Sequence, residues 1–446
     1  MVGPATGGTP GIGGAGVGGD NPVLTGGSPG APTGGRPATG GRPATGGSVS
    51  NPGTGGSPAG GNATGGSNAA TTGGKTGTGT GGLPATGGKT GTGGSGPAAT
   101  GGSVTTGTGG SATGGSGGGT VASGPCDVYA AASPATPCVA AYSMTRVLLK
   151  SYSGPLYQVR KGGSWSASAG TSGGTFQDIG TVAGGLADSA AQDAFCTGGT
   201  CTVSVLYDQS GKKNDLKVAP KGCYTGTASE PDSEASATKK STTINGHKVY
   251  ALYSVAHDGY RNNTGAGVPK GNVGQGIYAV MDGSRAGTGA ACCYDFGNAS
   301  TNNCNGGTMT ALFFGTGYWG KGAGSGPWFL GDFEGGVWSG GSGASNVTTA
   351  SNPSMAVPFA VGFLDSGPGN YAIRAANGQS GSIATAYDGA QPKTLSNQGG
   401  IILGIGGDNS NSSTGTFFEG AMTDGHPTLA TDTAVVQNVQ AAGYGK

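Results

Sequence analysis

One sharp break in composition limits what this chain can fold into. Every aromatic residue and every cysteine lies after residue 123, whereas residues 1–123 consist mostly of Gly, Thr, Ala, Ser and Pro in recurring Ala-Thr-Gly-Gly units. A segment with so few apolar side chains cannot bury enough surface to offset the entropy lost on folding. We therefore expect residues 1–123 to be a disordered tether. A glycosylated stalk is the alternative, because the segment is rich in threonine.

Residues 124–446 are predicted to form one folded domain, because this length supports a sizeable core. The formal net charge of the whole chain is +1, which favours neither nucleic acid nor an acidic membrane as a partner. No run of about 18 apolar residues occurs, so no membrane span is expected. The start, Met1-Val2-Gly3-Pro4, lacks the charged and apolar regions of a secretion signal, which leaves the export route open.

The cysteines nevertheless favour export. There are eight, an even number, and all lie in the predicted domain. This usage is typical of disulfides in an oxidising compartment. Zinc binding is the alternative, but no two cysteines have CxxC spacing and the histidines are not clustered. We expect neither a metal nor another cofactor.

Short apolar or alternating runs separated by turn residues predict an all-β domain. The clearest strand is 202–207, which should place Val203, Val205 and Tyr207 on one face, while Leu206 departs from the pattern on the other. Few helices and many strands favour a β-sandwich or a barrel. Further strands are predicted at 276–281, 310–314, 357–361 and 401–403, and short helices at 143–152 and 433–442.

Two acidic segments carry the candidate chemistry. Glu334, one of only four glutamates, follows an apolar run that ends in Gly331-Asp332-Phe333, and Asp408 follows Ile401-Ile402-Leu403-Gly404-Ile405-Gly406-Gly407. Glycines let the backbone approach a ligand closely. Glycoside hydrolysis needs two carboxyl groups, one as an acid and one as a nucleophile or base. The alternative is that both residues only cap turns, which is common for Asp beside Gly.

An ordered series of motifs runs through the whole predicted domain. Its pieces are Gly124-Pro125-Cys126-Asp127, Thr136-Pro137-Cys138-Val139, Gly154-Pro155-Leu156-Tyr157, Ala190-Ala191-Gln192-Asp193, Tyr207-Asp208-Gln209-Ser210, Gly259-Tyr260-Arg261-Asn262, Ala291-Cys292-Cys293-Tyr294-Asp295, the two acidic segments, and Phe417-Phe418-Glu419-Gly420. In this order they resemble the catalytic domain of the family 54 α-L-arabinofuranosidases.

The resemblance implies a β-sandwich of jelly-roll type with the sugar site on its concave face. It also implies retention of configuration, with Glu334 matching the nucleophile and Asp408 the general acid/base. Asp332, two residues before Glu334, would share its strand face and bind sugar hydroxyl groups; the alternative is a solvated acid. Other implied sugar contacts are Trp319, Gly407, and the adjacent Cys292 and Cys293, whereas Trp328 is assigned to the core.

The family also implies how the cysteines pair. Two pairs close in sequence would form local disulfides, and the adjacent pair would form a vicinal one. The remaining two cysteines would then pair with each other. The expected disulfides are Cys126–Cys138, Cys196–Cys201, Cys292–Cys293 and Cys223–Cys304.

Two departures from the family pattern stand out. The family usually has Asn directly after the nucleophile, where this chain has Gly335. A side-chain amide for the sugar is thereby lost, although backbone contact from Gly335 or Gly336 is still possible. Many members also continue into an arabinose-binding β-trefoil module, whereas this sequence ends at Lys446.

Together these features predict a secreted or surface-tethered, metal-independent, exo-acting α-L-arabinofuranosidase. It would act as a monomer and release terminal arabinofuranose from side chains of arabinan or arabinoxylan, or from arabino-oligosaccharides. A tethered carbohydrate-binding module without activity is the alternative that Gly335 suggests. A structural surface protein with no sugar affinity is a third possibility.

Overall fold

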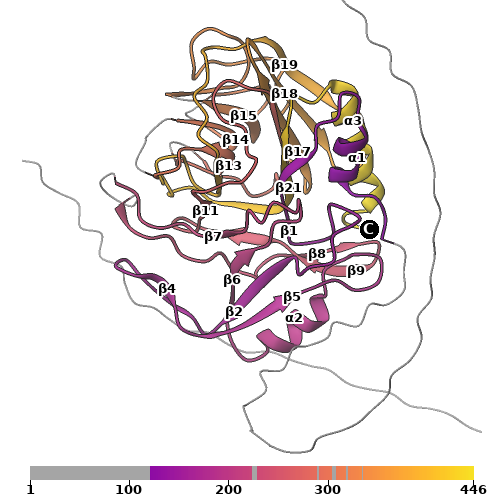
Figure 1. Cartoon of the computed structure of the whole chain (residues 1–446), viewed down its shortest axis with the longest axis vertical. Helices are drawn as coiled ribbons and strands as arrows, with labels where there is room; N and C mark the ends of the chain where they lie inside the picture. Colours follow the sequence, from indigo (N-terminus) through magenta and orange to yellow (C-terminus); the bar gives the residue numbers. More distant parts are fainter. Residues whose placement is uncertain (1–120, 224–228, 289–290, 304–307, 318–319, 334) are drawn as a thin grey trace, which may run out of the picture. The chain divides into compact units, whose positions relative to one another are not determined.

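A computed structural model describes residues 121–446, apart from 224–228, 289–290, 304–307, 318–319 and 334. In this part of the chain two large antiparallel sheets form a β-sandwich, with helices packed beside both of them (Figure 1). The smaller sheet has the order β1 (Cys138–Ser143), β21 (Gly415–Asp424), β12 (Gln275–Met281), β17 (Ala360–Gly367), β18 (Asn370–Asn377) and β19 (Ala384–Ala390), and β10 (Leu252–Ser254) also pairs with β21.

The larger sheet carries the site described below. Its strand order is β16 (Gly336–Trp338), β15 (Trp328–Phe333), β14 (Met309–Gly315), β13 (Asp295–Ala299), β20 (Gly400–Leu403), β11 (Tyr260–Asn262), β7 (Leu216–Val218), β6 (Cys201–Leu206), β2 (Tyr157–Lys161) and β5 (Thr175–Ile179). Two separate hairpins are β3 (Ser164–Ser166) with β4 (Gly170–Ser172), and β8 (Ser241–Ile244) with β9 (His247–Tyr250).

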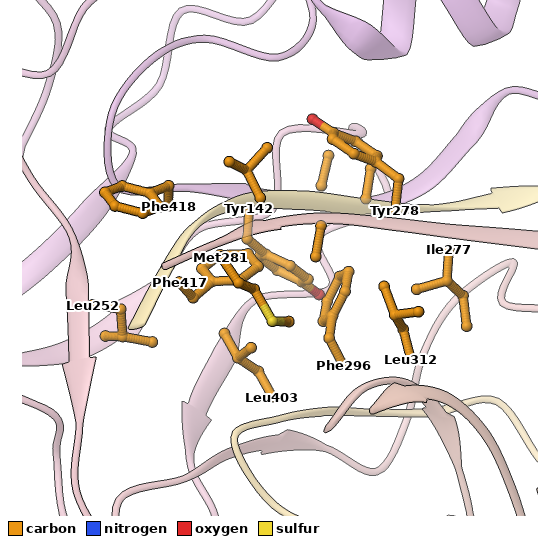
Figure 2. Packing of buried hydrophobic residues seen from close by; sticks show 14 of the residues in the cluster. Tyr142, Leu252, Ile277, Tyr278, Met281, Phe296, Leu312, Leu403, Phe417 and Phe418 are labelled. Atoms are coloured by element: carbon orange, nitrogen blue, oxygen red, sulfur yellow. The ribbon is translucent and has the colours of Figure 1, made fainter. Parts of the chain in front are cut away.

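The main core lies between the two sheets. Phe296 of β13 packs against Phe417 of β21, with ring centroids 5.6 Å apart, and Phe333 of β15 meets Tyr371 of β18 edge to face at 5.1 Å. Figure 2 shows Phe296, Leu312 and Leu403 of the larger sheet near residues of the smaller one. Because these side chains fill one face of the larger sheet, its opposite face is left for a site.

Two of the three helices in the described residues lie on the outer face of the smaller sheet. Tyr129 of α1 (Pro125–Ala131) contacts Tyr278 of β12, with ring centroids 6.1 Å apart. Asp432 of α3 (Leu429–Ala442) is ion-paired with Arg374 of β18. The third helix, α2 (Ser189–Cys196), packs beside β2, β5 and β9. No helix in the described part of the chain is long and apolar enough to cross a membrane.

Most predicted strands are confirmed, with changes at two of them. The strands expected at 276–281, 310–314 and 401–403 correspond to β12, β14 and β20. The run 357–361 is only partly a strand, because β17 begins at Ala360. In β6 a register shift against β2 leaves Ser204 without an opposing residue, so Val203 and Leu206 are both fully buried. The apparent departure at Leu206 therefore reflects a β-bulge.

The helix predicted at 143–152 is wrong, whereas the one at 433–442 is confirmed within α3. The Ser143 hydroxyl accepts hydrogen bonds from the amides of Thr145 and Arg146, which folds the chain into a turn. The amide of Val147 then bonds to the Gly185 carbonyl. The backbone amides that would form the hydrogen bonds of a helix are thus bonded to a side chain or to a residue distant in sequence.

Three of the predicted disulfides are present: Cys126–Cys138, Cys196–Cys201 and Cys292–Cys293. The first ties α1 to β1, and the second ties the end of α2 to β6. Cys223 is also disulfide-bonded, but its expected partner Cys304 lies outside the described residues.

Candidate active site

The floor of the candidate site is a row of neighbouring residues across five strands of the larger sheet. Pairing runs from Arg261 through Ile402, Gly297 and Ala311 to Asp332. Directly paired residues project from the same face of a sheet. In the middle of the row, Gly297 and Ala311 have little or no side chain, and the two charged residues stand at its ends.

A pair of buried carboxyl groups occupies one end of this floor. Asp332 of β15 is 7% exposed and Asp295 of β13 is fully buried. One carboxylate oxygen from each, together with the Cys293 sulfur, lie within 4.8 Å of one another. Burial raises the pKa of Asp332, a hydrogen bond with Asp295 lowers it, and the charge of Asp408 raises it to a smaller extent. Burial and the charge of Asp332 raise the pKa of Asp295 well above its usual range.

The vicinal disulfide forms an apolar wall beside this pair. Cys293 packs in a small cluster with Phe313, Trp328, Leu330 and Val337, and Cys292 lies against it. The sulfur of Cys293 is bonded in the disulfide, so the cluster with Asp295 and Asp332 offers two carboxylates and no thiolate to a cation.

Asp408 lies on the loop that follows β20, and this loop is tied to the disulfide. Oδ1 of Asp408 accepts hydrogen bonds from the amide and hydroxyl of Ser410, at 2.9 and 2.6 Å. The Ser410 carbonyl in turn accepts from the amide of Cys293. A Cβ placed on Gly406 would lie 3.2 Å from both Asp408 Oδ1 and Cys293 Sγ. The structure therefore brings Asp408, the disulfide and Asp332 together at one face of the sheet.

A buried aspartate, Asp232, is hydrogen-bonded to this loop. Both oxygens of Asp232 accept hydrogen bonds from side-chain amides, Asn409 at 2.9 Å and Asn411 at 2.6 Å. Burial raises the pKa of Asp232 to about 8, although these two hydrogen bonds favour its charged form. Asn409 has a φ of 73°, a left-handed conformation that Asn tolerates better than most residues. Asp232 thus fixes a tight turn directly after Asp408.

Arg261, at the other end of the floor, is hydrogen-bonded to Gly407, the residue just before Asp408. Its guanidinium donates to the Gly407 carbonyl at 2.9 Å and to the Ser300 carbonyl at 2.7 Å. Its Nε donates to Asn263 Oδ1 at 2.6 Å. Burial lowers the pKa of Arg261 to about 10, and the charges of Asp408 and Asp232 oppose that change, so the side chain is charged at neutral pH.

Several predicted site residues can now be placed. Gly407 is buried against Met309, and the Gly407 carbonyl accepts a hydrogen bond from Arg261. Gly335 has a φ of 80° and Gly336 begins β16, so both lie next to the end of β15. Trp328 is 3% exposed and is buried as predicted, but in the small cluster with Cys293 and not in the main core between the sheets. Glu334 and Trp319 lie outside the described residues.

Two of the other glutamates have structural partners away from this site. Glu419 is fully buried under the helices, where both of its oxygens accept from Arg146, at 2.6 and 2.7 Å. Glu234 is paired with Arg160 at 2.8 Å. Neither is available as a catalytic carboxylate at the site.

Comparisons with known proteins support this picture. The family model "Alpha-L-arabinofuranosidase B, catalytic" matches residues 125–445. The chain belongs to the family 54 α-L-arabinofuranosidases.

Similar curated proteins share close to half of the aligned residues with this family 54 domain. The "Arabinofuranosidase/B-xylosidase" of Trichoderma koningii is 45% identical over 333 residues, and the "Probable alpha-L-arabinofuranosidase B" of Aspergillus clavatus is 46% identical over 332. These matches cover 73% and 72% of this chain, but only 63% of each relative.

Solved structures of family 54 enzymes agree with the fold. A "GH54 a-l-arabinofuranosidase soaked with cyclic sulfate inhibitor" has a TM-score of 0.66 and 42% identity, and the match covers 72% of this chain and 66% of that one. An arabinofuranosidase "complexed with arabinofuranosyl-alpha-1,2-xylobiose" has the same score and identity, with 72% and 65% covered.

The sequence alone gives no role to Arg261, Asp295 or Asp232. Both Arg261 and Asp295 stood in the motifs that carried the resemblance. The sequence signal that could have pointed to Arg261 and Asp295 is a charged residue inside a short strand-like run, because charged residues are rarely buried without a partner or a function.

Proposed function

We propose that this chain is a retaining, exo-acting α-L-arabinofuranosidase that releases terminal arabinofuranose from side chains of arabinan or arabinoxylan. The observation that supports this most is the gathering of Asp332, Asp408 and the Cys292–Cys293 disulfide on one sheet face within a family 54 catalytic domain. A relative's structure contains arabinofuranosyl-α-1,2-xylobiose, which favours an arabinose-bearing xylan among the substrates.

In the proposed mechanism, Glu334 attacks the anomeric carbon while Asp408 gives its proton to the leaving oxygen. The bond to the aglycone breaks, and arabinose is held as an ester of Glu334. Asp408, now a carboxylate, takes a proton from water, which attacks the same carbon and releases Glu334. Two displacements give retention, and they need the two carboxyl groups about 5–5.5 Å apart.

Other groups would bind the sugar without reacting. The carboxylate of Asp332 would accept a hydrogen bond from a hydroxyl group of the furanose. The disulfide and Trp319 would offer apolar surfaces to the ring, and Gly335, Gly336 and Gly407 would approach it through their backbone. Since the Gly407 carbonyl already accepts a hydrogen bond from Arg261, the Gly407 amide is the backbone group that would donate to the sugar.

The disulfides support export, because such bonds persist in oxidising compartments. We propose that the protein is secreted or held at the cell surface through the Gly- and Thr-rich segment 1–123. We also propose that it works as a monomer on plant cell-wall polysaccharides or arabino-oligosaccharides, and without a nucleic-acid partner.

A panel of aryl glycosides tests this function directly. The purified chain should release nitrophenol from the α-L-arabinofuranoside and should lose that activity on Glu334→Gln, because an amide cannot form the glycosyl-enzyme. Glu230→Gln is the matched control, since Glu230 is half-buried and has no proposed role. Arabinose binding without turnover by the unmodified chain would instead support the carbohydrate-binding module.

A further inference from the structure

The proposed mechanism gives no task to Asp295, although this residue is fully buried next to the site. Within the described part of the chain, neither of its carboxyl oxygens accepts a hydrogen bond from a donor group. A buried carboxylate in that condition is costly. The polar group within reach is the carboxyl of Asp332, which belongs to the same close cluster.

The register of the sheet explains why these two side chains meet. Asp295 stands two residues before Gly297, on the same face of β13. Gly297 is paired with Ala311, and Ala311 with Asp332. Asp295 itself is paired with Phe313, two residues from Ala311, so the two aspartates stand diagonally across β14, where Ala311 contributes only a methyl group.

Two carboxylates this close in a buried place cannot both be charged. Asp295 is the more deeply buried of the two, and Asp332 keeps some access to solvent. Burial raises the pKa of Asp295 well above its usual range, and the charge of Asp332 raises it further. A proton held by Asp295 would satisfy its own oxygen and one lone pair of Asp332 at the same time.

We propose that Asp295 is a positioning residue that shares one proton with Asp332 and holds it as a singly charged acceptor for a hydroxyl group of the furanose. The proton lies on Asp295 and is donated to Asp332. This fixes the rotation of the Asp332 carboxylate, because one oxygen is held by Asp295 and the other faces the sugar. The inference rests on the proposed arabinofuranosidase function only for the identity of the sugar.

Infrared difference spectroscopy tests the shared proton without any substrate. At pH 7 the spectrum of the unmodified chain minus that of Asp295→Asn should show the C=O stretch of one protonated carboxyl group. Asp365→Asn is the matched control, because Asp365 forms a second buried carboxyl pair, with Asp432 beside Arg374, on the outer face of the other sheet. Absence of the band in the Asp295→Asn difference would overturn the proposal, even in a fully active enzyme.

Kinetics then tests the positioning role. Asp295→Asn keeps a hydrogen-bond donor, so KM for an aryl arabinofuranoside should stay within about 3-fold, whereas Asp295→Leu should raise it about 10-fold for the lost hydrogen bond. The part of the alkaline loss of kcat/KM that arises when the pair gives up its proton should disappear in Asp295→Asn, whereas the part that arises from ionisation of the general acid Asp408 should remain. Asp365→Asn should leave KM and the pH profile unchanged.

A purely structural Asp295 predicts a different result. Both variants would then lose stability while the folded protein kept the KM and pH profile of the unmodified chain, and this result would refute the positioning role. If the unmodified chain showed the infrared band but hydrolysed no arabinofuranoside, the proposed function would fail while the shared proton stood.

Discussion

Replacing Arg261 by lysine should disturb both the stability of the fold and the position of Asp408. A lysine ammonium can keep a charge in this place but cannot bond to the Gly407 and Ser300 carbonyls in a fork. Hydrogen bonds from charged groups contribute about 1.5–3 kcal/mol each, so the loss of one or two should lower the free energy of unfolding by about 2–4 kcal/mol. Because Asp408 follows Gly407, a small shift of the loop should reduce kcat/KM about 10–100-fold.

Urea unfolding and kcat/KM on an aryl arabinofuranoside, measured where both proteins are folded, would separate the two effects. Arg374→Lys is the matched control, because Arg374 is equally buried but binds Asp365, Asp388 and Asp432 away from the site. It should lose stability and keep its kcat/KM within about 2-fold. If Arg261→Lys lost stability but kept normal kcat/KM, Arg261 would not position Asp408.

Three further predictions concern other parts of the chain. Asp408→Asn should slow the hydrolysis of natural oligosaccharides far more than that of an activated aryl arabinofuranoside. Added azide should rescue turnover of this variant and give an arabinosyl azide of retained configuration. An inverted product would show that Asp408 is not the general acid/base. Deleting residues 1–120 should leave the melting temperature and the kcat/KM on a soluble substrate nearly unchanged, and a large loss of either would make the segment part of the fold. Gly335→Asn should lower KM about 3-fold through one added hydrogen bond, because its φ of 80° suits Asn and, among the described residues, a Cβ there would meet Lys393 Nζ at 3.5 Å. An unchanged KM would mean that this amide does not reach the sugar.

The sequence predicted the parts of the fold that depend on local pattern. Apolar runs such as β12 and β14 are buried along their whole length, and α3 begins at the capping hydroxyl of Thr428. The helix expected at 143–152 failed because its backbone groups bond to residues distant in sequence. No local pattern reveals such partners.

The same limit applies to the site. Asp332 and Asp408 could be selected from their flanking glycines and from the family resemblance. The roles of Asp295 and Arg261 depend on strand register, since each reaches its partner across neighbouring strands or from a distant loop. Register between strands far apart in sequence is set by the assembled sheet.

Trapping the glycosyl-enzyme tests the central claim most directly. In Asp408→Asn the first step should proceed with an activated aryl arabinofuranoside, while the second should be slow because water lacks its base. Mass spectrometry of the intact protein should then show the addition of one arabinosyl group, and peptide mapping should place it on Glu334. An adduct on another residue, or no adduct during turnover that inverts the sugar, would contradict the assignment of Glu334 and the retaining mechanism.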